Sequence, residues 1–508
     1  MTENIKSLNL WTERRTIIVY ALSIIALAEI IDLTIVSVAI PDLMGALGAN
    51  INEVSLTMTS YIVAAAVCIP LTGLVTRKYG IKTVALYSTF IFGVASVLCG
   101  TATSLNQMIV YRLIQGIGGA FLPALAQSYV VDNFTEKEQP KIITIVTLCI
   151  VLGPIIGPVM GGSIIEHATW RWIFYVNVPV CLLGFGLIAL FMDNTENNRI
   201  KIDFISFVFM ALGIACLEYF IDEGNINSWF QSIMMVCILA AAIILIGFFI
   251  WRGLLGNSVI KLEIFTNLNF VLSCLIMFLF FSALSGCLSF FPSMLQNAYG
   301  MPPDTAAYIQ APRGVAAIIG APIYLMLSKK IDARILMAFA MLLAGFSTAY
   351  LGYLDTSIHI KLLVVLVVLQ GFGMIGVFVL IMSIAYIGVP TELSGDCSGV
   401  FNFFRNFAAS IGTSIASTVI SIQQQVNWHS LSSHISYYSH GFSLWFANAT
   451  NIDANSKIRL VAAEIARASM LQAYINIFYA SGIALMLFAW LPFLLKKPDP
   501  NAKVAMGH

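Results

Sequence analysis

The sequence predicts an all-α membrane protein, and three observations carry that prediction. Of the 508 residues, 59% are hydrophobic and only 10% are charged, whereas a soluble domain carries about 25% charged residues. The apolar residues gather in uninterrupted segments of about 20 residues, the length that an α-helix needs to cross a bilayer. Lysines and arginines cluster between these segments. A soluble fold of this composition could not cover its surface with polar groups, so lipid must surround much of the chain.

Fourteen segments are long and apolar enough to span a membrane. Several contain Gly or Pro, which membrane helices tolerate because neighbouring groups satisfy the freed backbone atoms. The predicted spans are 16–40, 54–75, 83–103, 107–131, 141–165, 171–192, 203–221, 230–252, 268–291, 305–328, 333–353, 361–387, 399–422 and 471–495.

The distribution of basic residues predicts the orientation of these spans. Cytoplasmic loops carry an excess of Lys and Arg. With residues 1–15 in the cytoplasm, most of the basic residues fall on the inner side, and an even number of spans returns residues 496–508 to the cytoplasm. We therefore expect a multi-pass protein of the cell inner membrane.

Two short sequence matches indicate an internal repeat. TRKYGIK at 76–82 resembles SKKIDAR at 328–334, and QGIG at 115–118 recurs as QGFG at 370–373. The offsets are nearly equal, at 252 and 255 residues. The sequence thus predicts an N-terminal half over 16–192, two inserted helices over 193–252, and a C-terminal half over 253–495. Repeated halves that meet at a midplane site are typical of secondary transporters.

Charged residues inside the first and fourth spans are the strongest functional candidates. An Asp or Arg in mid-helix costs about 2.5 to 3.5 kcal/mol on insertion scales. Glu29 and Asp32 are three residues apart and share one helical face. Two such carboxylates should not both ionise easily, so we expect one, with Asp32 ahead of Glu29, to bind and release a proton. Arg112 could sense that protonation as an ion-pair partner. The alternatives are a structural hydrogen-bonding pair and a fixed ion pair.

The fifth span combines small residues with prolines. Gly153, Gly157 and Gly161 recur every four residues, a pattern that allows close helix contact. Pro154 and Pro158 should bend this helix. Packing alone and a flexible contact that controls opening between the halves both fit this pattern.

Three other intramembrane charges allow a structural or a substrate-binding role. We expect Arg313 and Arg405 to reach the membrane surface or to form ion pairs, and Glu218 to lie at the outer interface. Residues 423–470 are predicted to form one long outer loop, which would suit partner docking or gating.

Several function classes find no support in the sequence. The net charge of +1 indicates no nucleic-acid partner. There is no phosphate-binding loop for ATP, no convincing nucleophile–base pair, and no metal-ligand spacing among the nine cysteines. The chain is therefore expected to be neither an enzyme nor a holder of a cofactor or metal.

Taken together, several motifs resemble the major facilitator superfamily, and in particular its fourteen-helix drug/proton antiporter branch, the EmrB/QacA-like exporters. They are IDLTIVSVAIPDL with Asp32, GLVTRKYGIKTV, YRLIQGIGGA with Arg112, LGPIIGPVMGG, and WRWIFYVNVP at 170–179. The similarity runs from about residue 17 to 495.

The resemblance implies two six-helix bundles with two inserted helices and alternating access driven by the proton gradient. It assigns an antiporter motif and a conformational-switch loop, and it places Gln115 among the candidate substrate-binding or structural residues. The antiporter motif comprises Gly153, Pro154, Gly157, Pro158, Gly161 and Gly162. The loop comprises Gly73, Arg77, Lys78, Gly80 and Lys82. Thr76 stands where the superfamily usually has an aspartate that latches the halves, which puts that latch in doubt.

The resemblance also implies export of hydrophobic or amphipathic toxic compounds in multidrug efflux and drug resistance. A periplasmic adaptor and an outer-membrane channel are candidate partners, as for some Gram-negative relatives. Export of one endogenous metabolite such as a siderophore, uptake, and a membrane sensor without transport remain as alternatives.

Overall fold

The structure is a computed structural model of the whole chain. It describes residues 14–49, 51–135, 138–193, 203–255, 260–353, 360–386, 389–390, 393–433 and 454–496. Over these residues the regular secondary structure is entirely helical.

The N-terminal half contains six membrane-crossing helical segments, some of them built from two consecutive helices. They are α2 (Arg14–Val38); α4 (Ile51–Cys68), continued by η1 (Ile69–Leu71) and α5 (Thr72–Tyr79); α6 (Ile81–Thr101); α7 (Leu105–Gly119) with α8 (Leu122–Asn133); α9 (Gln139–His167); and α10 (Trp172–Tyr175) with α11 (Asn177–Phe191). The short α3 (Ile40–Leu47) follows α2. Gly80 joins α5 to α6 at φ +79°, a conformation that glycine adopts without steric cost.

Two helices follow before the C-terminal half begins. The pair consists of α12 (Phe204–Glu223) and α13 (Ile233–Leu254). The C-terminal half consists of α14 (Leu268–Ser293) with the π-helical turn η4 (Met294–Ala298), α15 (Pro303–Leu327), α16 (Ala333–Leu351), α17 (Ile360–Ala385), α18 (Ser394–Ser433), and α20 (Ala454–Phe488) with η6 (Leu491–Leu494).

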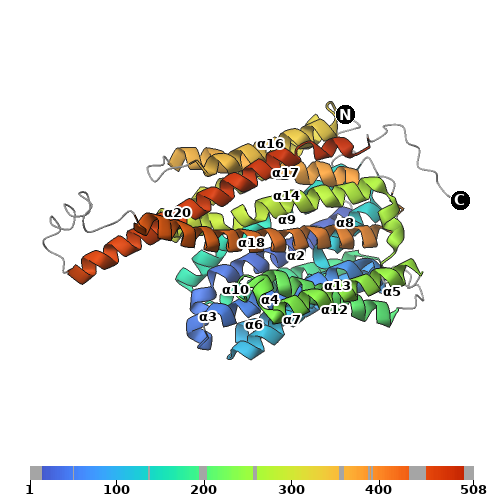
Figure 1. Cartoon of the computed structure of the whole chain (residues 1–508). Helices are drawn as coiled ribbons and strands as arrows, with labels where there is room; N and C mark the ends of the chain where they lie inside the picture. Colours follow the sequence, from blue (N-terminus) through green and yellow to red (C-terminus); the bar gives the residue numbers. More distant parts are fainter. Residues whose placement is uncertain are drawn as a thin grey trace.

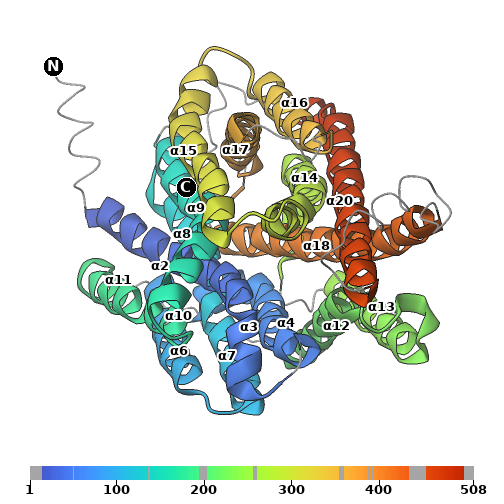
Figure 2. The ribbon, with the colours of Figure 1, turned by 90° about the vertical axis from the view of Figure 1, so that its left-hand side faces the viewer.

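The helices run roughly parallel to one another and form two groups (Figures 1 and 2). Viewed along the helices, the blue and cyan N-terminal helices form one group and the yellow-to-red C-terminal helices form the other (Figure 2). Helix α9 packs on α2 of its own half and on α15 and α17 of the other half. Helix α12 packs against α4 and α18, so the inserted pair contacts both halves.

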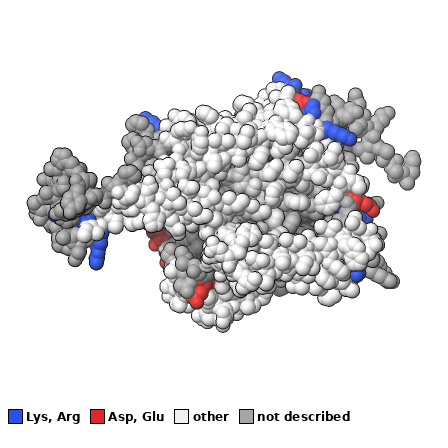
Figure 3. Space-filling view, in the orientation of Figure 1, with Lys and Arg blue, Asp and Glu red and all other residues white. Residues whose placement is uncertain are grey.

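The surface of this fold suits a lipid environment. Charged side chains gather toward the two ends of the helices and leave a broad uncharged zone between them (Figure 3). Large apolar side chains are exposed on lipid-facing helices, among them Leu182 and Leu183, each 69% exposed, and Ile244, 70% exposed. These positions confirm a multi-pass integral membrane protein.

Each of the fourteen predicted ranges contains a helix, but composition alone does not confirm fourteen spans. Within the described part of the chain, twelve helices are long and apolar enough to cross a membrane, and the bent α9 would be a thirteenth. Helix α18 is not among them. It carries Asp396 and Arg405, and its outer section is polar.

The prediction of one outer loop over 423–470 was wrong at both ends. Helix α18 continues to Ser433, and α20 already begins at Ala454. With about 1.5 Å of rise per residue, the 40 residues of α18 exceed the thickness of a bilayer. The two helix ends project together beyond the rest of the fold (Figure 1), and we call residues 423–433 and 454–470 the outer arm. Residues 434–453 of the predicted loop lie outside the described residues.

Candidate functional site

Asp32 and Arg112 form an ion pair in the interior of the N-terminal half. Asp32 lies on α2 and Arg112 on α7, and both are 0% exposed. Arg112 Nη1 donates to Asp32 Oδ2. Since an unpaired buried guanidinium is strongly unfavourable, the contact explains how both charges persist in an apolar bundle. The sequence predicted both residues but could not establish that their helices touch.

Two side-chain amides complete the environment of this carboxylate. Gln115 Nε2 donates to Asp32 Oδ1 at 3.0 Å, and Asn177 Nδ2 donates to the same oxygen at 2.6 Å. Gln115 also accepts from Arg112 Nη1 at 2.8 Å and donates to Ser96 Oγ at 2.9 Å. Asp32 therefore accepts hydrogen bonds on both of its carboxylate oxygens.

Glu29 has different partners, although it shares a helical face with Asp32. Its Oε1 accepts a hydrogen bond from Tyr61 Oη at 3.1 Å, and the side chain is 3% exposed. The ring of Tyr61 lies 4.3 Å from the Arg112 guanidinium carbon, a cation–π distance. Tyr61 thus contacts both Glu29 and Arg112, which connects the two carboxylates through one aromatic residue.

Three glycines of α9 pack directly against the helix that bears Asp32. A side-chain carbon at Gly153, Gly157 or Gly161 would collide with Ile30, Thr34 or Ile35 of α2, respectively. Gly162 faces open space. The helix bends by 46° between its segments Gln139–Pro154 and Ile156–His167, as its two prolines predict. The glycine row therefore brings α9 into close contact with the turns of α2 beside Asp32.

Arg77 joins the two halves at one end of the fold. It lies on α5 and forms an ion pair with Asp396, the third residue of α18. Asp396 is 0% exposed, and its backbone is close to Gly73, where a side chain would collide with it. Thr76, the departure from the superfamily pattern, donates to the carbonyl oxygens of its own helix, at Thr72 and Gly73. Contact between the halves here involves Arg77 and Asp396. Lys78 and Lys82 are partly exposed.

Further polar contacts close the same end. Ser128 Oγ of α8 lies 3.2 Å from Ser394 Oγ of α18. Gln127 Oε1 accepts from Asn402 Nδ2 at 2.6 Å and from Tyr386 Oη at 3.3 Å. The halves are thus sealed together at the end that carries Arg77.

The structure corrects the expectations for three other charges. Arg313 and Arg405 are only 3% and 4% exposed, so neither reaches the membrane surface. No ion pair with a carboxylate forms at either one among the described residues. Glu218 is 1% exposed and accepts from Ser410 Oγ of α18 at 2.8 Å. It lies inside a helix contact instead of at the outer interface.

Glu218 belongs to a set of contacts through which α12 reaches both halves. One helical turn further on, Asp222 accepts a hydrogen bond from Thr59 of α4. Ser414 of α18 donates to the carbonyl oxygen of Ile221. The inserted helix is thereby hydrogen-bonded to the N-terminal half on one side and to the C-terminal half on the other.

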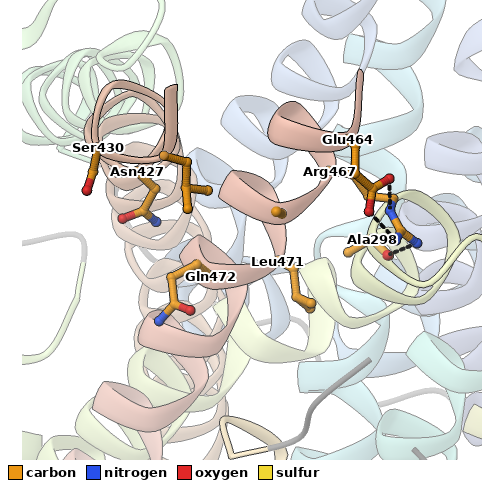
Figure 4. Close-up of a pocket in the computed structure, with 9 residues that line it drawn as sticks. Ala298, Asn427, Ser430, Glu464, Arg467, Leu471 and Gln472 are labelled. Atoms are coloured by element: carbon orange, nitrogen blue, oxygen red, sulfur yellow. Dashed lines mark hydrogen bonds and ion pairs between the residues drawn. The ribbon is translucent and has the colours of Figure 1, made fainter. Parts of the chain in front are cut away.

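One pocket lies in the outer arm, away from the Asp32 cluster. It has a volume of about 430 Å³ and lies between α18, α20 and the end of η4. Arg467 and Glu464, one turn apart on α20, form an ion pair of 2.6 Å at the rim of the pocket (Figure 4). The lining residues are Ala298, Asn427, Ser430, Leu431, Glu464, Arg467, Ala468, Leu471 and Gln472.

Sequence reasoning from charge missed several members of the site. Asn177, Tyr61 and Ser96 are uncharged, so the cost of burial does not single them out. Asn177 lies in the quoted segment WRWIFYVNVP, and that segment was the one signal that could have found it. Asp396 was missed because it lies just before the predicted span 399–422.

The fold and its buried ion pairs define a polytopic membrane transporter. The family model of the Major Facilitator Superfamily matches residues 22–413, and the chain belongs to this superfamily. It is not an enzyme family.

Two relatives carry the name of an exporter, and a third carries the name of a resistance protein. The chain is 28% identical over 488 residues to the Multidrug export protein EmrB of Escherichia coli, covering 95% of each chain. It is 31% identical to the protein of the same name from Haemophilus influenzae, covering 82% of this chain and 83% of that one. The Fatty acid resistance protein FarB of Neisseria gonorrhoeae is 26% identical over 82% of this chain and 83% of its own length.

A solved structure confirms the fold. The human organic anion transporter MFSD10 superimposes with a TM-score of 0.59 at 14% identity, covering 93% of this chain and 99% of that chain. The chain is thus an EmrB/QacA-like member of the superfamily, in agreement with the resemblance drawn from its motifs.

Proposed function

We propose that this protein is a proton antiporter of the inner membrane that exports hydrophobic or amphipathic toxic compounds by alternating access. The observation that carries the proposal is the fully buried Asp32–Arg112 pair. Its relatives named as multidrug exporters support the direction and the substrate class. Both termini and the end sealed by Arg77 face the cytoplasm in this proposal.

The geometry supplies a coupling step. Arg112 donates to Asp32 Oδ2, while Gln115 and Asn177 occupy Oδ1. An incoming proton on Oδ2 competes with Arg112 for that oxygen. Protonation therefore breaks the ion pair and frees the guanidinium, which keeps its hydrogen bond to the Thr57 carbonyl oxygen at 3.3 Å. Deprotonation restores the pair.

That step acts on the contact between α2 and the bent helix α9. Because Gly157 fits against Thr34, two residues beyond Asp32, a small shift of α2 is transmitted to α9. Helix α9 in turn contacts α15 and α17 of the other half. A proton from outside favours the inward-facing state, where substrate binds between the halves, and release of the proton inward resets the site.

Energised everted vesicles test the proposal. Ethidium, a hydrophobic cation, and deoxycholate, an amphipathic anion, serve as transport probes with an imposed pH gradient. We expect Asp32→Asn to abolish gradient-driven transport while probe binding persists. Asp42→Asn is the matched control, because it makes the same change at an exposed carboxylate of α3. Unchanged coupling in Asp32→Asn would remove Asp32 from the mechanism.

The same vesicles separate the rival functions. Depletion of the probes from everted vesicles on energisation would indicate uptake. Binding without movement would indicate a sensor. Movement of neither probe, together with a change in secreted metabolites in a knockout, would indicate a dedicated metabolite exporter.

The outer arm supports a second part of the proposal, a periplasmic adaptor as partner. Ile458 and Leu460 on α20 are 57% and 49% exposed, and Leu431 on α18 is 37% exposed. Exposed apolar residues on a projecting helix pair suit a protein contact. Site-specific photocrosslinking from Ile458 in intact cells should capture a periplasmic protein, whereas a probe at the exposed, cytoplasmic Lys330 should not.

A further inference from the structure

A polar cluster around Gln370 in the C-terminal half resembles the cluster around Gln115 in the N-terminal half. In the N-terminal half, Gln115 accepts from Arg112 and donates to Ser96. In the C-terminal half, Gln370 accepts from Arg313 Nη2 at 2.7 Å and donates to Thr348 Oγ1 at 2.8 Å. Both glutamines are the first residue of the repeated motif, QGIG at 115–118 and QGFG at 370–373. The two halves thus build the same glutamine–hydroxyl pair beside a buried arginine.

The two clusters differ in the helix that carries the arginine and in the counter-ion. Arg112 lies on α7 with Gln115, whereas Arg313 lies on α15 and Gln370 on α17. Asp32 balances Arg112, but Arg313 forms no ion pair with a carboxylate among the described residues, and the thiol of Cys287 lies in its surroundings. Cys287 is a buried free cysteine of α14. The other face of the guanidinium lies 5.6 Å from the ring centre of Phe291. Neither neighbour supplies a negative charge that balances a guanidinium.

Arg313 also has a free hydrogen-bond donor. Its Nε is buried and has no acceptor. A guanidinium cannot shed its charge by losing a proton in a protein, and an unpaired buried cation is strongly unfavourable. Arg405 likewise forms no ion pair within the described part of the chain and has a buried Nη1 without an acceptor, while its Nε and Nη2 donate to Asn406 Oδ1 at 3.2 and 3.0 Å. Arg313 is therefore, with Arg405, one of two buried intramembrane cations that form no ion pair with a carboxylate among the described residues.

The location of Arg313 fits a ligand that arrives between the halves. It lies in the middle of α15 and is held by Gln370 of α17. Both helices pack against α9 of the N-terminal half. Separation of the halves along α9 would bring this pair of helices to the edge of the opening.

We propose that Arg313 binds the anionic head group of amphipathic substrates and thereby gives this exporter its capacity for organic acids. The carboxylate acts as a counter-ion, as Asp32 does for Arg112, and accepts from the free Nε of Arg313, while the apolar tail lies against Phe291. The inference rests on the proposed export function and adds a specificity-determining residue. An anionic lipid phosphate shares this chemistry and is separated from substrate by the test.

Two probes of matched chain length test the inference in proteoliposomes. Dodecanoate carries a carboxylate and dodecyltrimethylammonium carries a fixed positive charge. Because hydrogen bonds to charged groups contribute about 1.5 to 3 kcal/mol, we expect Arg313→Gln to raise the KM for dodecanoate about 10- to 100-fold. The KM for dodecyltrimethylammonium should stay within about twofold, and Arg313→Lys should restore part of the dodecanoate transport.

A second variant keeps the inference testable if Arg313→Gln does not fold. Gln370→Glu is nearly isosteric and places a carboxylate within reach of Arg313, which supplies the counter-ion that the N-terminal half already has. It should abolish dodecanoate transport and preserve that of dodecyltrimethylammonium. Equal losses for both probes in Arg313→Gln and Gln370→Glu, or no loss for either, would overturn the inference.

Lipid composition decides between the two anion sources. The assay is repeated in vesicles of phosphatidylcholine alone and in vesicles that also contain phosphatidylglycerol. If Arg313 binds substrate, the difference between the probes persists in both. If transport of both probes requires phosphatidylglycerol and the variants abolish that requirement, the anion is a lipid and the inference fails.

Failure of the export proposal can be distinguished from failure of the proposed role of Arg313. If the wild-type protein moves neither probe, equilibrium binding of dodecanoate to the purified protein still tests the site, with Arg313→Gln as the comparison. Weaker binding to the variant would support the site without transport, and equal binding would overturn it.

Discussion

Replacing Arg77 by alanine should shift the protein away from the conformation in which the halves are sealed at the Arg77 end. The substitution leaves the Asp396 carboxylate buried without its cation. In the ion pair, the side chain of Arg77 is 16% exposed and that of Asp396 is 0% exposed. Breaking a buried ion pair by removing one partner costs about 3 to 5 kcal/mol. Asp396 is in the first turn of α18. The helix dipole there stabilises the unpaired carboxylate by about 1 kcal/mol and reduces this cost.

The net effect on the sealed conformation is then about 2 to 4 kcal/mol. Since 1.36 kcal/mol corresponds to a factor of ten, the equilibrium between sealed and open conformations should move about 30- to 900-fold toward the open one. A shift of this size is expected because the ion pair exists only when the halves are in contact at this end.

Electron–electron distance measurements between spin labels at Tyr79 and Lys330, both exposed, provide the assay. The labels are introduced into a variant that lacks the native cysteines. The ratio of the short-distance to the long-distance population should fall in Arg77→Ala and recover largely in Arg77→Lys. Lys82→Ala is the control, because this basic residue is partly exposed. An unchanged ratio in Arg77→Ala would refute the assignment of a latch to this pair.

Three further predictions follow from the other contacts of the site. Asn177→Ala removes a buried hydrogen bond to a carboxylate, worth about 1.5 to 3 kcal/mol, and should weaken proton-driven transport at least tenfold; wild-type rates in vesicles would contradict this. Gly157→Ala should lower the melting temperature of the purified protein, whereas Gly162→Ala, whose new methyl group meets no neighbour, should not; equal melting temperatures would count against the close contact of α9 with α2. Ser410→Ala leaves Glu218 without its hydroxyl partner on α18 and should speed hydrogen exchange in α12; unchanged exchange would show that the contact does not hold the inserted helix.

Hydropathy and the cost of buried charge predict much of this structure. Each predicted span contains a helix because the apolar segments match the bilayer thickness and a helix satisfies its own backbone. The same cost identified Asp32 and Arg112, since each must have a partner to persist in an apolar bundle.

The features that could not be predicted from the sequence depend on contacts between distant segments. Asn177 has no unusual burial cost, and only its distance to Asp32 shows its role. The outer arm was predicted as a loop because residues 423–433 and 454–470 are polar, yet the two helix ends contact each other, for example through the Asn427 amide and the Ser469 carbonyl oxygen at 3.3 Å. Arg313 was expected to reach the membrane surface or to form an ion pair, because the sequence does not show that α14 and α17 enclose it.

Proton release on substrate binding would show whether Asp32 couples substrate binding to proton transfer. Purified protein in weakly buffered detergent is mixed with ethidium while a pH-indicating dye reports the free protons. The account predicts that the wild-type protein releases protons on binding ethidium, and that Asp32→Asn binds ethidium and releases none. Equal proton release from Asp32→Asn and the wild-type protein would contradict the claim that Asp32 couples export to the proton gradient.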